Sequence, residues 1–355
     1  MAANQVPRLG RPFPCWIRPP PYPPGQYSET WRPCTLHTLS SLTYPISGNN
    51  FLLRRLRATG EMVFGFLTAI GDTLWEYGTF LTLLLVLVCT ISALSTWKEE
   101  LLRKEWSAAG KDVVVLHTFG RGYVCPHMSP FGLKLETYLR MAGYKIQIEE
   151  KAPTSSKGKS PWITLNGVDI TDSQLIIDHL SANNKSFSSH LSDKERAIAN
   201  AFQIMVDEHL YWGLVRYRYL TDPHIRAFEL TSVYPKWIRY MVPLMRYLFR
   251  KALRAQGIGR HSDAEVLEIM RKDLESISIY LGEKPFMMGD EPCEVDCSVF
   301  GQLGQLLWNA PDSPYYTMVT EDFPNLQQYC LRMKEKFWPD WEEVLDKPLK
   351  DVHGL

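Results

Sequence analysis

The chain has 355 residues, of which 45% are hydrophobic, so it is long enough and apolar enough for two domains with cores of their own. Its 39 basic and 39 acidic side chains cancel, so the net charge gives no indication of a nucleic-acid partner. Seven scattered cysteines without a C-x-x-C pair argue against a disulfide framework and favour a reducing compartment.

The N-terminal stretch, residues 1–73, is predicted to be a Pro-rich and largely disordered arm. Residues 1–50 hold ten of the 24 prolines, and the run PPPYPP at 19–24 is incompatible with a helix or the interior of a sheet. The alternative is that this run is a polyproline ligand for a proline-recognition domain. No apolar core follows a basic start, so the pattern does not predict a secretory signal.

Residues 74–97 are predicted to form a transmembrane helix. No charge interrupts the segment from Tyr77 to Trp97, and its last nineteen residues would rise about 28 Å as a helix, close to the thickness of the hydrocarbon core. The alternative is a buried helix of a soluble domain. More basic residues follow the span than precede it, so the main domain is expected in the cytosol, with the organelle left open. Residues 98–111 are charged and are predicted to be a short connector.

Residues 112–182 are predicted to form a β-α-β-β-β-α domain. The β-branched run Val113–Leu116 is typical of a strand covered on both faces. Ser129 and Pro130 are a suitable N-cap and first residue for the helix that follows, which ends near Gly143. Ile146 to Ile148 then begins a second strand.

The second half of this domain is predicted from its turn residues. A strand is entered through Pro161, which makes the preceding peptide bond a candidate for the cis form. Asn166-Gly167 is a hairpin turn signal, so a further strand is expected over Asp169-Ile170. Gln174 to Leu180 is predicted to be a helix.

Residues 190–341 are predicted to form an all-helical domain, which a polar linker separates from the preceding one and a tail at 342–355 follows. Apolar residues recur there at helical spacing. Helices are expected from near Asp193, over Pro235–Leu253, Asp263–Leu281, Asp296–Trp308 and Leu326–Phe337.

Several segments, taken in their order along the chain, resemble one family. They are VVVLHTF, SPFGLKLETYLRMAG, the PWI strand, IIDHL, DKERAIANAF, FMMGDEPCEVDCSVFGQL and KFWPDW. Together they resemble the failed axon connections family, a metaxin-like branch of the glutathione transferase-like proteins, over Asp112 to Trp341. The resemblance implies an N-terminal thioredoxin-like domain and a C-terminal helical domain, here preceded by the transmembrane helix.

The resemblance also implies a glutathione-like pocket. Ser129 matches the residue that holds the glutathione sulfur, Ser160 and Pro161 match the clamp on the cysteinyl part, and Asp172 and Ser173 match the pair at the γ-glutamyl end. Each position has a structural alternative, because Ser129 and Asp172 are also good helix caps and Pro161 is also a structural proline of this fold. Ser129 is therefore a candidate catalytic residue only.

No metal site is predicted. Cys125 and His127 are only two candidate ligands, and no further ligands follow at the spacing of a zinc site, so both are interpreted as loop residues. His209 and His224 are isolated histidines.

We therefore expect a membrane-anchored, non-catalytic interaction module, and the resemblance implies a role in axon development. The first alternative is an active glutathione transferase, and the second is a mitochondrial outer-membrane component of the metaxin type. A single membrane span and protein partners are expected, without nucleic acid. No cofactor is required; glutathione as a ligand and a homodimer are left open.

Overall fold

The computed structural model describes residues 50–231 and 236–346 of the chain. Its first element is one continuous helix, α1 (Asn50–Ser107), of 58 residues. The helix therefore begins well before residue 74 and includes most of the predicted connector, which differs from the expected arm, span and connector. The physical reason is that no proline occurs between Pro45 and Pro126, so nothing forces the helix to break there. The proline run at 19–24 lies outside the described residues.

Helix α1 contains the apolar stretch. Within the described residues, Tyr77–Ser107 is the one stretch that is long and apolar enough to cross a membrane, judged by length and composition. None of its apolar window is buried against the rest of the chain. The helix ends before Gly110 and Asp112, which adopt the left-handed conformation at φ 99° and 60°.

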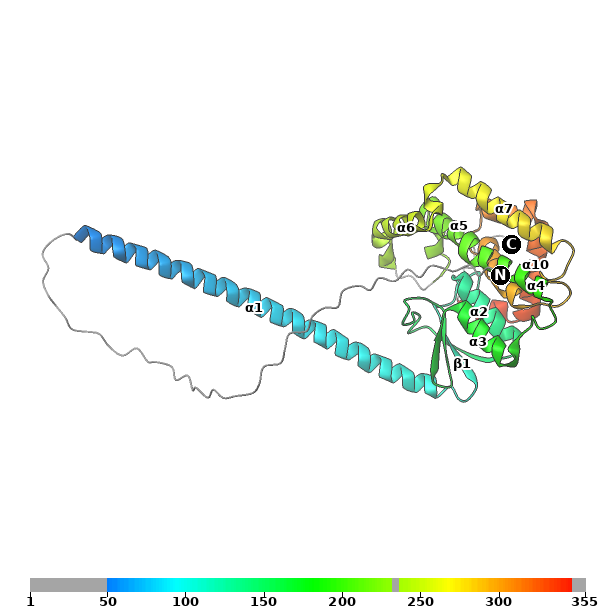
Figure 1. The fold of residues 1–355 in the computed structure, drawn as a ribbon, viewed down its shortest axis with the longest axis horizontal. Coiled ribbons are helices and arrows are strands. Elements are labelled where there is room, and N and C mark those ends of the chain that lie inside the picture. Colours follow the sequence, from blue (N-terminus) through cyan, green and yellow to red (C-terminus); the bar gives the residue numbers. More distant parts are fainter. Residues whose placement is uncertain (1–49, 232–235, 347–355) are drawn as a thin grey trace, which may run out of the picture. The chain divides into compact units, whose positions relative to one another are not determined.

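A four-stranded sheet follows, with the thioredoxin-like order β2-β1-β3-β4. Figure 1 labels its strand β1. Strand β1 pairs in parallel with β2, and the pairs β1–β3 and β3–β4 are antiparallel. This is the predicted β-α-β-β-β-α order. The elements are β1 (Val113–His117), α2 (Pro130–Met141), β2 (Lys145–Glu149), β3 (Trp162–Leu165), β4 (Val168–Thr171) and α3 (Ser173–Leu180).

The predicted cis peptide bond and the predicted hairpin turn are both present. The Ser160-Pro161 bond is cis. Asn166 and Gly167 have φ 50° and 81°, as a two-residue hairpin turn with both central residues at positive φ requires.

The two faces of the sheet are covered by different helices. Side chains alternate along a strand, so Val114 and Leu116 face α2 and α3, whereas Val115 and His117 face the other way. The last turns of α1 cover that second face, where Trp106 lies 4.4 Å from the ring of His117. The ring of His117 also stacks on Trp162 at 3.6 Å. The strand is thus buried on both sides, as its β-branched run predicted.

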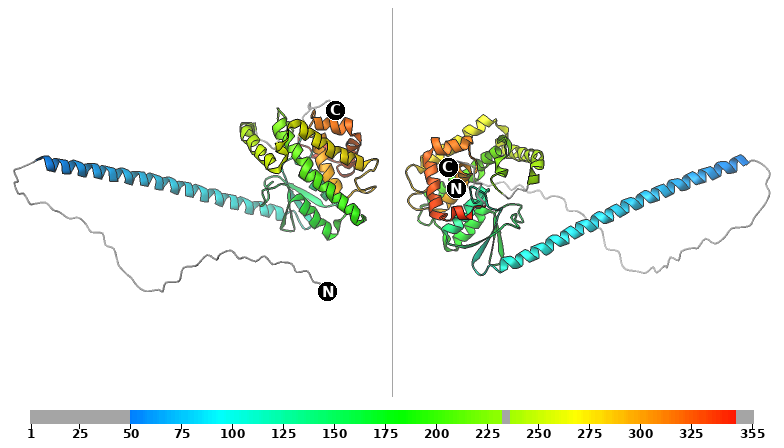
Figure 2. Two further views of the ribbon diagram at one scale, coloured as in Figure 1. Left: turned by 45° about the horizontal axis from the view of Figure 1, so that its top comes forward. Right: turned by 180° about the vertical axis from the view of Figure 1, so that it is seen from behind.

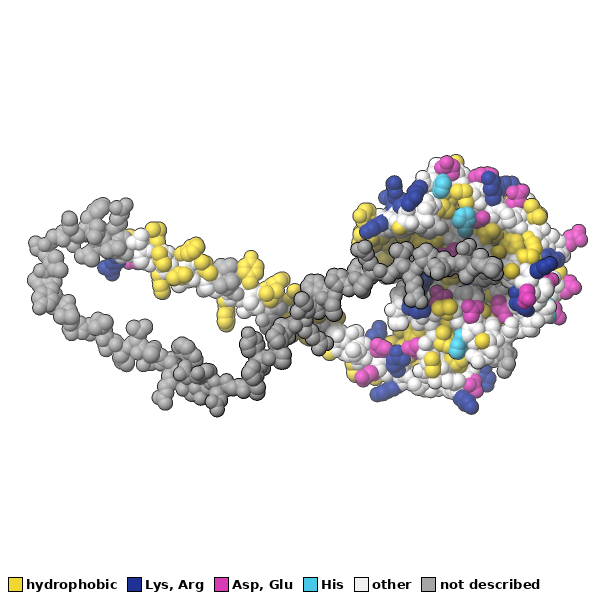
Figure 3. Space-filling model, viewed as in Figure 1, with side chains coloured by type: hydrophobic (Ala, Val, Ile, Leu, Met, Phe, Trp, Pro, Cys, Tyr) yellow, Lys and Arg dark blue, Asp and Glu magenta, His cyan; other side chains and the backbone are white. Residues whose placement is uncertain are grey.

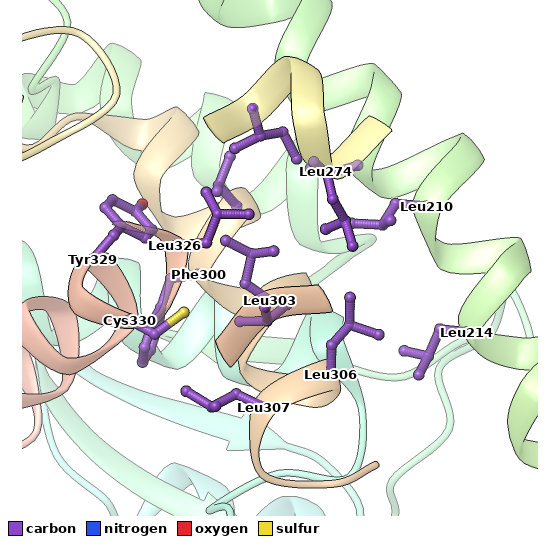
Figure 4. Packing of buried hydrophobic residues seen from close by; sticks show 14 of the residues in the cluster. Leu210, Leu214, Leu274, Phe300, Leu303, Leu306, Leu307, Leu326, Tyr329 and Cys330 are labelled. Atoms are coloured by element: carbon purple, nitrogen blue, oxygen red, sulfur yellow. The ribbon is translucent and has the colours of Figure 1, made fainter. Parts of the chain in front are cut away.

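The remaining elements form the helical domain, which lies next to the strands in Figures 1 and 2. Its buried side chains include Leu210, Leu274, Phe300 and Leu303, which converge from separate helices in Figure 4. The main helices are α4 (Asp193–Ile204), α5 (Tyr211–Arg216), α6 (Val242–Gln256), α7 (Asp263–Leu281), α8 (Glu294–Leu307) and α10 (Pro324–Phe337). Shorter elements are α9 (Pro314–Thr317), α11 (Trp341–Val344) and the π-helical segments Met205–Leu210 and Tyr217–Thr221.

One predicted helix of this domain is shorter than expected. The segment predicted as a helix over Pro235–Leu253 is a 3-10 turn, Lys236–Met241, followed by α6. Pro243 lies in the first turn of α6, where its missing N–H is tolerated, so the regular helix begins at Val242.

Helix α2 packs closely against the central helix α8. A Cβ atom on Gly301 would lie 2.6 Å from the carbonyl oxygen of Pro130, and one on Gly304 would lie 2.9 Å from a methyl carbon of Leu133. Glycine at both positions allows the two helices to approach each other, which joins the thioredoxin-like and helical domains.

We expect Gly301→Ala to lower the free energy of unfolding by about 1–3 kcal/mol, because the new methyl group meets backbone atoms that cannot move aside. Gly304→Ala should cost less, since the nearest atoms there belong to the side chains of Leu133 and Trp308. Denaturant unfolding of the full chain in detergent measures both. An equal effect of the two substitutions would contradict this account of the contact.

We also expect acid to destabilise the sheet through His117. Burial lowers its pKa from 6.5 to about 4. The unfolded chain therefore binds a proton in this range that the folded chain does not, so stability is lost as the pH falls from about 6.5 to about 4. The loss is up to about 3 kcal/mol.

His117→Gln should flatten this part of the pH profile of the melting temperature. The matched control is His190→Gln, which removes an exposed histidine. A slope that His117→Gln leaves unchanged would show that other groups cause the acid sensitivity.

Candidate functional site

A cleft of about 420 Å³ lies between loops of the thioredoxin-like domain and helices of the helical domain. The first domain contributes Phe119, Met128–Phe131, Thr154 and Gly158–Ser160 to its walls. The second contributes Asp207, Glu208, Tyr211, Trp212, Leu214, Val215, Arg218 and Tyr219. Part of the lining is aromatic, and the rest mixes aliphatic with polar and charged side chains, so the cleft suits a ligand with both kinds of surface.

Ser129 lines the cleft and also caps α2. Its backbone is extended, and its Oγ accepts a hydrogen bond from the N–H of Gly132 at 3.4 Å, near the limit for such a bond. Both interpretations of Ser129 are therefore compatible with its position. Gly132 itself is required by packing, because a Cβ atom there would lie 2.9 Å from Nδ1 of the buried His127.

The other predicted residues are only partly gathered around this cleft. Ser160 lines it, and its buried Oγ has no hydrogen-bond partner within the described parts of the chain. Pro161 follows directly through the cis bond. Ser173 is buried as the first residue of α3 and is not among the lining residues.

Asp172 reaches the cleft through Lys159. Its Oδ1 caps α3 by accepting from the N–H groups of Gln174 and Leu175, at 3.1 and 3.4 Å. Its Oδ2 lies 3.7 Å from Nζ of Lys159, which lines the cleft. The backbone of Asp172 has φ 79° and ψ 122°, a region that non-glycine residues rarely occupy and that costs on the order of 1–3 kcal/mol. Strain of this kind is found at ligand sites more often than elsewhere.

Asp207, which lines the cleft, belongs to a buried ion pair that the sequence did not predict. Lys134 of α2 donates to Oδ2 of Asp207 at 2.5 Å and to Oε1 of Gln174 at 2.6 Å. Both charged side chains are almost fully buried, at 1% and 7% exposure. Oδ1 of Asp207 is buried and has no hydrogen-bond partner among the described residues. Spacing alone offered no signal, because Lys134 and Asp207 lie on separate elements.

Three aromatic side chains of the lining lie together, and they are here called the aromatic end of the cleft. Phe131 and Tyr211 lie 4.9 Å apart, and Tyr211 lies 5.4 Å from Trp212. Burial raises the pKa of Tyr211 to about 12, so its hydroxyl stays protonated at neutral pH. This end therefore offers apolar surface to a bound molecule.

Cys125 and His127 belong to a structural network beside the cleft. Nε2 of His127 lies 2.5 Å from Oε2 of Glu136, which also accepts from Arg121 at 2.7 Å. Burial lowers the pKa of His127 and raises that of Cys125 to about 12, so neither group is charged at neutral pH.

Within residues 50–231 and 236–346, no group of three or more His, Cys, Asp or Glu side chains is arranged to hold a metal.

We expect Lys134→Met to lower the free energy of unfolding by about 3–5 kcal/mol, because it leaves the Asp207 carboxylate buried without its cation. The double variant Lys134→Met/Asp207→Asn should recover much of this loss. Denaturant unfolding of the full chain provides the measurement.

The control is Lys272→Met, which removes an exposed pair with Glu268 and should change stability by less than about 1 kcal/mol. Equal losses in Lys134→Met and Lys272→Met would rule out a buried, interacting pair.

Two family models match the chain in the order of these domains. The model "Glutathione S-transferase N-terminal domain" matches residues 130–224. The model "Glutathione S-transferase, C-terminal domain" matches residues 270–333. The first matched region contains α2 and the cleft-lining residues from Asp207 to Tyr219. The second matched region contains α8.

Individual relatives cover the same region. Failed axon connections of Drosophila melanogaster is 34% identical over 260 residues, which are 68% of this chain and 62% of that protein. Isoprene-epoxide--glutathione S-transferase of Rhodococcus sp. (strain AD45) is 29% identical over 235 residues, 61% of this chain and 97% of that protein. Metaxin-2 of Mus musculus is 21% identical over 216 residues, 59% of this chain and 82% of that protein.

The chain thus spans less than two thirds of the Drosophila relative and most of the other two proteins. The observed topology, the two matched models and the identity to the Drosophila protein agree with one another. The chain is a homologue of Failed axon connections and belongs to the glutathione S-transferase-like family that also contains the metaxins.

Proposed function

We propose that the chain is a membrane-anchored interaction module whose cleft binds glutathione without turning it over. The observation that carries this proposal is that Ser129 and Ser160, from separate segments, line one cleft with an aromatic end. The uncharged part of α1, Tyr77 to Trp97, would be the single span, with the main domain in the cytosol. The Drosophila relative is named for axon connections, and we extend a role in axon development to this chain.

The groups around Ser129 disfavour turnover. Conjugation requires a thiolate, which helix N–H groups and nearby cations stabilise. At the start of α2, Pro130 has no N–H, and the N–H of Gly132 is already bonded to Ser129. The lining carries two carboxylates, Asp207 and Glu208, beside two cations, Lys159 and Arg218, so it has no net positive charge to lower the pKa of a bound thiol. A bound glutathione would therefore remain a thiol, and the module would act through its protein partners.

A working glutathione transferase is the second candidate. The Rhodococcus relative favours it, because the alignment covers 97% of that protein, which is named as a transferase. In that case Ser129 would donate a hydrogen bond to the glutathione sulfur, and the aromatic end of the cleft would hold the electrophile.

We expect glutathione to bind the full chain in detergent micelles, as measured by titration calorimetry. Ser129→Ala should weaken binding about two- to tenfold, the value of one neutral hydrogen bond. Conjugation of a generic aromatic electrophile should proceed at the uncatalysed rate. Ser276→Ala, at an exposed position on α7, is the control.

The possible results separate the candidates. Conjugation that the chain accelerates and that Ser129→Ala abolishes would replace the module with the transferase. A lack of glutathione binding in the folded wild-type chain would remove the ligand from the proposal.

A further inference from the structure

Helix α6 and the 3-10 turn before it carry a row of exposed apolar side chains, here called the α6 face. It consists of Trp237, Tyr240, Leu244, Tyr247 and Leu248, which are 60%, 87%, 49%, 61% and 53% exposed. In Figure 3, apolar and basic side chains lie together at the edge of the head where Figure 1 places α6. So many large apolar side chains on one short segment mark an interaction surface.

The α6 face does not contribute to the core of the domain. The inner side of α6 carries Phe249, which stacks on Tyr219 at 4.0 Å, and the fully buried Leu253. Leu244, Tyr247 and Leu248 are spaced i, i+3 and i+4 on the outer side. The helix therefore has a second apolar stripe that the fold of the domain does not need.

The charge of this segment is of one sign. Residues 236–256 contain no Asp or Glu, although the charges of the whole chain balance. Arg250, Lys251 and Arg254 are exposed, and none of them makes an ion pair within the described residues. The six basic residues of the segment are Lys236, Arg239, Arg246, Arg250, Lys251 and Arg254.

This combination fits the surface of an anionic bilayer. Interfacial helices combine Lys and Arg with Trp, Tyr and Leu that enter the boundary between head groups and acyl chains. A second copy of the chain would set the same positive charges against each other in a symmetric contact, which is unfavourable. The proposed anchor would also hold the head at a high effective concentration near lipid.

We propose that the α6 face docks the head onto the anionic lipid surface of the membrane in which the chain is anchored. The apolar side chains Leu244, Tyr247 and Leu248 enter the interface, and Arg250, Lys251 and Arg254 bind lipid phosphates and carboxylates. This inference rests on the proposed membrane anchor and adds a second, reversible contact with the same bilayer.

The test is hydrogen exchange of residues 244–251 in the full chain, reconstituted in nanodiscs. One set of discs contains phosphatidylcholine alone, and the other also contains phosphatidylserine. We expect slower exchange in the anionic discs. Arg250→Gln/Lys251→Gln/Arg254→Gln should remove this difference, because losing three charges weakens docking roughly 100-fold.

A second variant tests the apolar contribution. Leu244→Ser/Leu248→Ser should also abolish the slowing, whereas Ile279→Ser, which alters a 74% exposed residue on α7, should not. Because all of these positions are exposed, the variants should fold, and exchange in α8 reports whether they do.

The outcomes distinguish the docking from the anchor. If the chain fails to co-elute with discs, the proposed anchor is wrong, and the docking proposal is overturned with it. If it co-elutes but residues 244–251 exchange equally in both discs, only the docking is overturned. If hydrogen exchange of residues 244–251 slows with protein concentration and not with anionic lipid, the α6 face binds another copy of the chain. That result would also overturn the proposal.

Discussion

The contact between α2 and α8 is the constraint on which most of the head depends. Helix α2 is covered by the sheet on one side and by α8 on the other, so polar residues such as Lys134 and Glu136 become buried along with its apolar stripe. Burial on two sides then requires a partner for each charge. Asp207 pairs with Lys134, and Arg121 with Glu136, and these pairs link segments that are distant in the sequence.

The cleft follows from the same contact. Because α8 holds the start of α2 in place, Ser129 lies opposite the π-helical segment and α5, which supply the helical wall. The polar end of the cleft contains groups whose hydrogen bonds are incompletely used, including Ser160 Oγ and Asp207 Oδ1 within the described residues. The aromatic end contains Tyr211 and Trp212. The cleft therefore keeps the form of a binding site, while its lining has no net positive charge that would stabilise a thiolate.

The other face of the sheet connects the head to α1. Trp106 donates to Oε2 of Glu149 at 3.1 Å and packs edge-on against the ring of His117. The last turns of α1 thus belong to the folded head as part of its hydrophobic core. The α6 face would give the same head a second contact with lipid.

The sequence by itself determined the order of strands and helices, the cis proline, the hairpin turn and the cap of α2. These features depend on local chemistry: the alternation of apolar residues, the restricted φ of proline, and the side chains that accept from free N–H groups. It also singled out Ser129 and Ser160, which the fold brings to one cleft.

Only the tertiary structure decided which polar residues are buried and which apolar residues are exposed. Lys134 and Asp207 meet because two domains pack together, and no local pattern records that contact. Apolar residues recur at helical spacing over Pro235–Leu253, yet most of α6 is exposed to solvent. Periodicity shows that a helix has apolar residues on a given side, but only the packing of its neighbours decides which side is covered.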